Sequence, residues 1–217
     1  PTAAITYSAT APFKNGDANV VITATFNGAV LDSPVPTIAI AGSGIAATSS
    51  TVMTKTSSTV YTYTYTVPTG DGTGTVTVGT GTDAAGNVVT STPTSGATFT
   101  VDNTSPTAAI TYSATAPFKN GDANVVITAT FNGAVLDSPV PTIAIAGSGI
   151  AATSSTVMTK TSSTVYTYTY TVPTGDGTGT VTVGTGTDAA GNVVTSTPTS
   201  GATFTVDNTS PTAAITY

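Results

Sequence analysis

Residues 59–67 read TVYTYTYTV, and the same nine letters return at residues 164–172. Tyrosine and threonine alternate along this stretch, and a period of two puts every second side chain of an extended strand on the same face. The three tyrosines and Val67 therefore share one face, while threonines occupy the other. A strand with one aromatic face and one hydroxyl face predicts a sheet that is buried on one side and solvated on the other, as in a two-layer sandwich.

Six further runs in the first 105 residues carry a strand signature, and clusters of Gly, Asn, Asp and Pro that favour turns separate them. We expect strands over residues 2–7, 20–26, 37–41, 47–54, 59–67, 75–82 and 97–101. No window shows a convincing 3.6-residue period, so we expect minimal helix. Seven short strands in about 100 residues are typical of an immunoglobulin-like sandwich, although the Cys…Trp…Cys pattern of antibody domains is absent. The predicted fold is all-β, with seven-stranded immunoglobulin-like β-sandwich domains.

The chain is a tandem repeat. Residues 1–105 recur without one substitution as residues 106–210, and residues 211–217 repeat the first seven once more. A period of 105 residues is too long for a solenoid unit and fits an independent domain. We therefore expect two identical domains, 1–105 and 106–210, arranged end to end, and the first strand of a third repeat at 211–217. We also expect the natural protein to continue beyond Tyr217.

The composition is poor in charged and catalytic residues. Ten acidic groups and four basic ones give a net charge of -6, and Cys, His, Trp, Arg and Glu are absent. The negative charge argues against nucleic acid and anionic membranes as partners, and no apolar run is long enough for a membrane-spanning helix. Without His or Cys the usual general base, thiol nucleophile and zinc ligands are missing, so we expect no enzyme. The threonine-rich, nearly uncharged composition favours an extracellular or cell-surface location.

Two runs near the end of the repeat resemble the closing signature of a known family. Val78–Asn87 reads VGTGTDAAGN, and Phe99–Pro106 reads FTVDNTSP. Both are similar to bacterial immunoglobulin-like repeats, the tandem modules that build the extender regions of large prokaryotic adhesins and related surface proteins. The resemblance covers the whole 105-residue unit. It implies a stalk, and it implies calcium at the domain junctions, where many members bind this ion and others do not.

Strand direction groups the five aspartates of each repeat into two sets. In a sandwich whose strands alternate in direction, the loops that hold Asp17 and Asp71 lie at the C-terminal pole, where Asp102 ends the last strand. Asp32 and Asp83 fall in loops at the N-terminal pole. Each pole therefore collects carboxylates that are far apart in sequence.

End-to-end stacking would bring the C-terminal pole of the first domain up to Asp137 and Asp188 of the second, with Lys14 as the only nearby cation. Crowded carboxylates repel, and calcium, which takes six to eight oxygen ligands, would relieve the repulsion. The expected calcium ligands are Asp102, Asn103, Asp188, Asn192, Asp137, Asp17 and Asp71. Asp and Asn also favour turns for purely local reasons, and that alternative stays open.

The favoured function is that of a structural extender that holds a distal adhesive domain away from the cell, with neighbouring identical repeats as its partners. The alternative is a self-assembling extracellular filament or matrix fibre, in which lateral copies pair through uncharged edge strands. A third interpretation is a module that binds glycan or ice through the threonine face of Thr62, Thr64 and Thr66.

Overall fold

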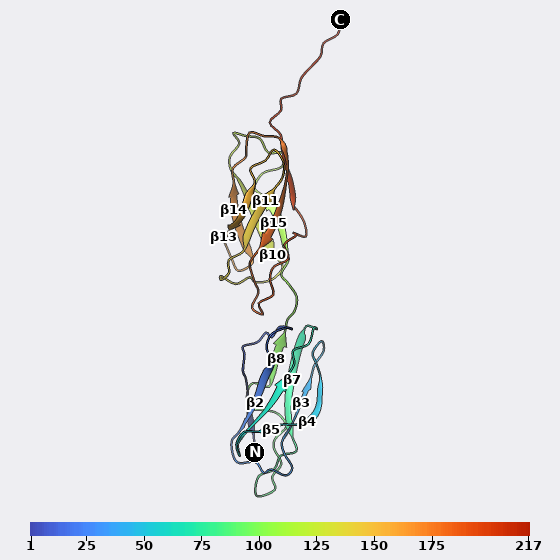
Figure 1. Cartoon of the computed structure of the whole chain (residues 1–217), viewed down its shortest axis with the longest axis vertical. Coiled ribbons are helices and arrows are strands. Elements are labelled where there is room, and N and C mark those ends of the chain that lie inside the picture. The colour runs from blue at the N-terminus through green and yellow to red at the C-terminus, as the bar shows by residue number, and fades with distance from the viewer. The chain divides into compact units, whose positions relative to one another are not determined.

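The structure is a computed structural model that describes residues 1–217, and it contains strands but no helix. Nothing in it therefore forms a helix long and apolar enough to cross a bilayer. The chain divides into two compact units, unit 1 at residues 1–104 and unit 2 at residues 105–217, one residue before the boundary that the repeat suggests. Each unit has its own hydrophobic core, and Figure 1 labels strands of both.

Unit 1 consists of two four-stranded sheets. The first has the order β1 (Ala3–Tyr7), β2 (Val20–Phe26), β6 (Val60–Tyr65) and β5 (Thr54–Lys55). The second has the order β4 (Thr48–Val52), β3 (Thr37–Ala41), β7 (Gly72–Gly79) and β8 (Thr98–Val101). All neighbouring strands are antiparallel. This order is that of an immunoglobulin-like sandwich, so the predicted fold class is confirmed.

Unit 2 repeats this topology strand for strand. Its first sheet has the order β9 (Ala108–Tyr112), β10 (Val125–Phe131), β14 (Val165–Tyr170) and β13 (Thr159–Lys160). Its second sheet has the order β12 (Thr153–Val157), β11 (Thr142–Ala146), β15 (Gly177–Gly184) and β16 (Thr203–Val206). Each unit therefore uses its own first strand, and no strand is exchanged between the sheets of different units.

Each unit has eight strands instead of the predicted seven, because the strand expected at 47–54 changes sheets. Its first part, β4, pairs with β3 in one sheet, and β5 pairs with β6 in the other. Between them Met53 is only 2% exposed and belongs to the core. The other predicted strands are present with ends shifted by up to three residues. The strand expected at 75–82 is β7, which ends just before Thr80, a residue with a φ of 59°.

The alternation of residues 59–67 sets the core face of β6 as predicted. Tyr61 and Tyr65 are fully buried, Val67 is buried, and Tyr63 is partly buried against the core. The threonines between them are intermediate or exposed. Core packing therefore accounts for the tyrosines, whose large rings supply much of the apolar surface that a small sandwich can bury.

The core of unit 1 contains an aromatic cluster centred on Phe99 of β8. The ring of Phe99 lies 5.1 Å from that of Tyr65, 5.5 Å from that of Phe13 and 5.6 Å from that of Tyr7, measured between ring centroids. A glycine, Gly74, lies under this ring: a Cβ there would lie 2.6 Å from Cε1 of Phe99. The cluster joins both sheets, and unit 2 reproduces it around Phe204.

The two buried tyrosines of β6 differ in hydrogen bonding. The Tyr61 hydroxyl donates to the Val30 carbonyl oxygen at 3.2 Å, whereas the Tyr65 hydroxyl is buried without a partner. Burial raises the pKa of Tyr65, and the nearby backbone of Ala46 opposes this rise without reaching hydrogen-bonding geometry. A buried polar group without a partner costs stability.

We therefore expect Tyr65→Phe to unfold at the same temperature as the unchanged chain or a higher one. Tyr61→Phe should lose about 1 kcal/mol, because it removes a formed hydrogen bond. Thermal unfolding of the two variants provides the comparison, and each serves as the other's control. If Tyr65→Phe proved the less stable of the two, the Tyr65 hydroxyl must have a partner, and the expectation would be wrong.

All four sheet edges of unit 1 carry features that hinder pairing with another strand. The edge of β1 is covered by the chain around Ser95, whose carbonyl oxygen accepts a hydrogen bond from the Ile5 amide at 3.0 Å. The edge of β8 is covered by Phe13, whose amide donates to the Thr100 carbonyl at 2.9 Å. Strand β5 has two residues and ends in Lys55, and β4 has a register shift in its pairing with β3.

Residues 211–217 form no strand, although they have the sequence of the segment that contains β1. In unit 1 that segment pairs with β2, and no copy of β2 follows residue 217 in this sequence. The side chains of Ile215 and Tyr217 are correspondingly exposed. The strand expected at 211–217 is therefore not formed here, because its pairing partner is missing.

Candidate functional site

Three segments meet at one end of unit 1, which we call its C-terminal pole: residues 13–17, 67–72 and 102–104. The Asn15 amide donates to Oδ1 of Asn103 at 2.7 Å, and Nδ2 of Asn15 donates to the Val67 carbonyl at 2.8 Å. The grouping of these loops follows from the alternating strand directions, as predicted. Unit 2 forms the same contacts between Asn120 and Asn208, at 2.7 Å, and between Asn120 and Val172, at 2.9 Å.

Asp71 is the centre of this pole. Its Oδ1 accepts a hydrogen bond from the Asn103 amide at 2.5 Å, and its Oδ2 accepts one from the Thr104 hydroxyl. The Thr104 hydroxyl and then the Asn103 amide hold the pKa of Asp71 below its usual value, so this exposed carboxylate is ionised at neutral pH. The side chain of Asn103 also donates to the carbonyls of Gly70, at 2.8 Å, and Pro68, at 3.2 Å.

The other two aspartates of this pole make local turn contacts. Oδ2 of Asp17 accepts the Lys14 amide at 3.2 Å, and Oδ1 of Asp102 accepts the Thr104 amide at 3.0 Å. Hydrogen bonds between an Asp side chain and an amide two or three residues away in sequence are common in turns. Asp17 and Asp102 therefore lie at the predicted pole, and turn chemistry accounts for the contacts described.

The opposite end of unit 1, its N-terminal pole, contains residues 30–32, 57–59 and 82–88. Here Oδ1 of Asp83 accepts the amides of Asn87, at 2.9 Å, and Ala85, at 3.0 Å, and the Asn87 side chain donates to Oδ2 at 2.9 Å. Gly86 closes the turn with a φ of +82°, a conformation that favours glycine. The hydrogen bond from the Asn87 side chain is the main reason that the pKa of Asp83 is lowered.

Unit 2 forms the same turn with two of the predicted calcium ligands. Oδ1 of Asp188 accepts the amides of Asn192 and Ala190, both at 2.9 Å, and Nδ2 of Asn192 donates to Oδ2 of Asp188 at 3.0 Å. Asp188 and Asn192 are thus brought together as the spacing suggests. Asn192 contacts Asp188 through its backbone and side-chain N–H groups, and these hydrogen bonds stabilise the turn itself.

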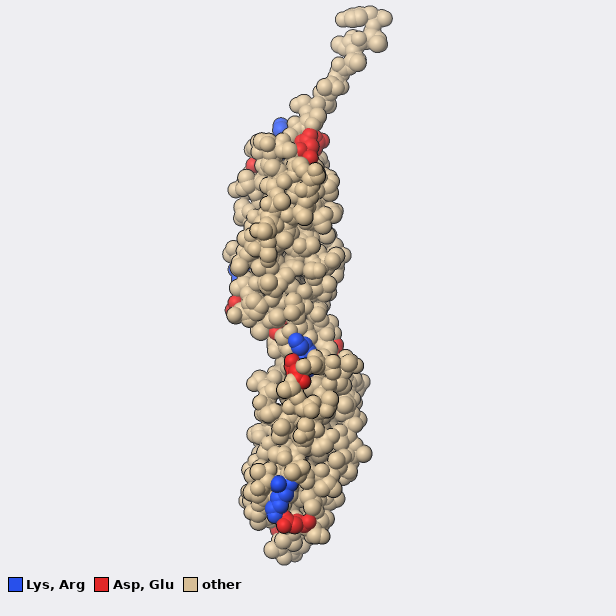
Figure 2. Space-filling view, viewed as in Figure 1, with Lys and Arg blue, Asp and Glu red and all other residues tan.

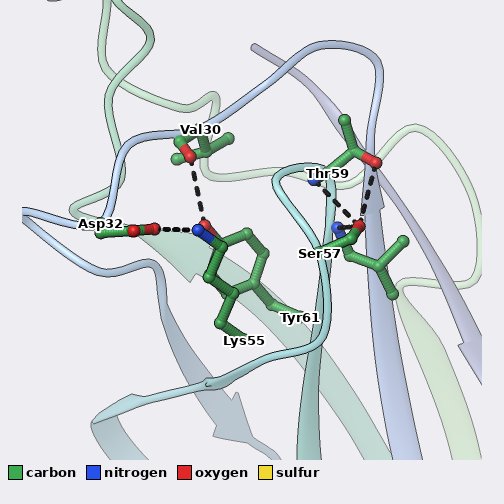
Figure 3. Close-up of polar contacts among 7 residues, drawn as sticks. Val30, Asp32, Lys55, Ser57, Thr59 and Tyr61 are labelled. Atoms are coloured by element: carbon green, nitrogen blue, oxygen red, sulfur yellow. Dashed lines mark hydrogen bonds and ion pairs between the residues drawn. The ribbon is translucent and has the colours of Figure 1, made fainter.

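Asp32 and Asp137 each form an ion pair that the sequence analysis missed. Lys55 pairs with Asp32 (Figure 3). Lys160 pairs with Asp137 in unit 2. The pKa of Lys55 is raised, mainly by its hydrogen bond to Asp32. Lys14 is therefore not the only cation near the predicted ligands, since Lys160 forms an ion pair with Asp137. Partners 23 residues apart give no local sequence signal, so the pairing depends on the strand crossover that brings β5 to this pole.

The structure brings the predicted calcium ligands together in pairs within each unit. Asp71 contacts Asn103 in unit 1, and Asp188 contacts Asn192 in unit 2. Within either unit no three carboxylates form a group that could hold a metal ion. Calcium at this set of residues remains a prediction.

The flanks of the sandwich carry few charges. Figure 2 shows acidic and basic atoms mainly near the ends of each unit, while most of the remaining visible surface is uncharged. In the first sheet the register pairs Thr6 with Thr23, Thr23 with Thr62, and Thr62 with Thr54, so a row of threonines crosses all four strands. At the level of Thr62, the predicted threonine face therefore continues across all four strands of the sheet.

Comparison with known proteins gives weak structural similarity only. No family model and no curated protein matches the chain. FdeC, an adhesin of Escherichia coli, matches with a TM-score of 0.48 and 13% sequence identity over 95% of this chain and 64% of its own. InvE, an adhesin of Yersinia pseudotuberculosis, matches with a TM-score of 0.33 and 16% identity over 94% of this chain and 58% of its own. The chain thus spans less than two thirds of either adhesin.

Proposed function

We propose that this chain is part of the stalk of a secreted or cell-surface protein and that its repeats hold a distal adhesive domain away from the cell. The observation that carries the proposal is the repetition itself: one 105-residue sequence, used twice, gives two self-contained sandwiches with the same strands and the same core. A seven-residue strand spans roughly 23 Å at about 3.3 Å per residue. Each further copy would add a few nanometres of length.

The surface supports a spacer over a binding module. The flanks are nearly uncharged, and a row of threonines crosses the first sheet. The two aspartates of unit 1 with a lowered pKa, Asp71 and Asp83, hold loop segments or form a turn. The four edges of unit 1 are covered, short or irregular. These features disfavour lateral strand pairing, so we retain the stalk in preference to a laterally assembled fibre.

We include calcium in this proposal as an additional stiffening element at the junctions, with the ligands predicted from the sequence. Extracellular calcium modules bind with dissociation constants of about 10⁻⁴–10⁻³ M, so millimolar calcium is the appropriate test concentration. An ion that binds only the folded chain raises the melting temperature of that chain by mass action. We expect thermal unfolding of residues 1–217 to shift upwards in calcium relative to chelator. If the melting curves in calcium and in chelator were equal, calcium would be dropped from the proposal. The stalk function would then be tested only by the stiffness of the repeat array.

The test of the stalk is small-angle scattering on chains of two, four and eight repeats. A stiff stalk should lengthen in proportion to the number of repeats. A flexible chain of domains should instead grow roughly as the square root of that number. Square-root growth in both calcium and chelator would contradict the proposed function.

A further inference from the structure

The segment that joins the two units is held by hydrogen bonds on both sides of one residue, Ser105. On the unit 1 side, Asn103 and Thr104 bind the carboxylate of Asp71 through the Asn103 amide and the Thr104 hydroxyl. The Asn103 side chain also accepts a hydrogen bond from the Asn15 amide and donates to the carbonyls of Pro68 and Gly70. The chain is therefore fixed to unit 1 up to Thr104.

On the unit 2 side, the chain is fixed from its first proline. The Pro106 carbonyl accepts the Thr195 amide at 2.8 Å. The Thr107 amide donates to Oδ1 of Asn132 at 2.9 Å, and the Asn132 amide returns a bond to the Thr107 carbonyl at 3.0 Å. These contacts lie within unit 2 and hold residues 106 and 107 before β9 begins at Ala108.

Ser105 itself has little conformational freedom. The proline ring fixes φ of Pro106 near −65°. The same ring disfavours the helical region for the preceding residue and favours an extended backbone at Ser105. Few soft dihedral angles remain between the last residue held by unit 1 and the first held by unit 2.

We propose that Asp71 is a linker clamp, a carboxylate whose bonds to Asn103 and Thr104 limit bending at the joint after each repeat without a metal ion. This inference rests on the proposed stalk function and supplies a source of its stiffness. Asp71 suits the role because one side chain holds two consecutive linker residues through both of its oxygens. Hydrogen bonds to an ionised acceptor are stronger than those between neutral groups.

The repeat provides a matched control for this proposal. Asp176 makes the same two bonds in unit 2, to the Asn208 amide and the Thr209 hydroxyl. Asp71→Ala and Asp176→Ala therefore remove identical contacts, but only the first lies at the joint between the two units. Thr104→Val and Thr209→Val form a milder pair that removes one bond each, in case the alanine variants lose stability.

The measurement is the distribution of distances between two spin labels, one in each unit, recorded in chelator and again in calcium. The chain has no native Cys, so Thr25→Cys and Thr130→Cys, at exposed equivalent positions, introduce the only labelling sites. A version with Gly-Gly-Ser-Gly inserted after Ser105 supplies the distribution of a freely bending joint. Thermal unfolding verifies that both alanine variants remain folded.

We expect a narrow distribution for the unchanged chain in chelator, a broadened one for Asp71→Ala, and no change for Asp176→Ala. A distribution for Asp71→Ala as narrow as that of the unchanged chain would overturn the clamp and leave the stalk intact. If the unchanged chain were narrow only in calcium, the ion would be the source of stiffness and the clamp would again be wrong. An unchanged chain as broad as the insertion variant in both conditions would contradict the stalk itself.

Discussion

Phe99→Ala in the two-unit chain should produce two separate unfolding transitions where the unchanged chain shows one. Phe99 is 3% exposed and lies at the centre of the aromatic cluster of unit 1. Removing a buried phenylalanine side chain costs about 3–5 kcal/mol, from lost burial and from the cavity left behind. A change of about 1 kcal/mol moves the melting temperature of a domain of this size by roughly 4–8 °C. Unit 1 should therefore melt at least about 12 °C below unit 2.

Differential scanning calorimetry of the 217-residue chain resolves the two transitions. Phe204→Ala is the matched control, because it removes the same ring from an identical cluster in unit 2. In Phe204→Ala, unit 2 should melt at the lower temperature and unit 1 should be unchanged. The double variant should show a single transition at the lower temperature. If Phe99→Ala lowered one common transition of the whole chain, the units would not unfold independently, and the separate cores would not be separate stability units.

Local sequence pattern predicts most of this fold, because the burial of a strand depends on its own alternation. The faces of β2 and β6 follow directly from residues 20–26 and 59–67. The poles could also be predicted, since alternating strand directions determine which loops share an end. The contact of Asn103 with Asp71, 32 residues away in sequence, is a consequence of that rule.

The strand crossover and the lysine pairs could not be predicted in this way. Residues 48–51 and 54–55 are polar, with only Val52 and Met53 between them, so their alternation does not distinguish one strand from two strands in different sheets. Only the burial of Met53 marks the crossover. Because Lys55 reaches Asp32 only after this crossover, an error in strand assignment became an error in the electrostatics of the pole.

The candidate site illustrates a second limit of sequence reasoning. An aspartate in a loop can be a metal ligand, a turn former or a tether for another segment, and its own sequence context is similar in all three cases. In the structure, Asp83 forms a turn and Asp71 holds a segment that is remote in sequence. These roles depend on which amides and hydroxyls the fold brings near each carboxylate.

Gly72→Ala should be the other strongly destabilising change, because a side chain at this position would overlap a neighbouring backbone segment. The same backbone positions Asp71. Gly72 opens β7, and a Cβ there would lie 3.0 Å from the carbonyl carbon of Ser43 and closer still to its oxygen. Gly44 makes the reciprocal approach, with a Cβ 2.9 Å from the Asp71 carbonyl carbon. Two backbones are in contact here, so no side-chain rotation can relieve the overlap.

Forcing extra volume into such a contact costs about 1–3 kcal/mol, and we expect Gly72→Ala at the upper end of that range. Chemical denaturation measures the loss, with Gly28→Ala as the control. A Cβ on Gly28 would meet no atom within 4 Å, and that variant should stay within about 0.5 kcal/mol of the unchanged chain. Equal stability of the two variants would show that the loops at residues 42–44 and 70–73 separate easily. Asp71 would then lack the fixed backbone that a linker clamp requires, and the joint would have to derive its stiffness from another source.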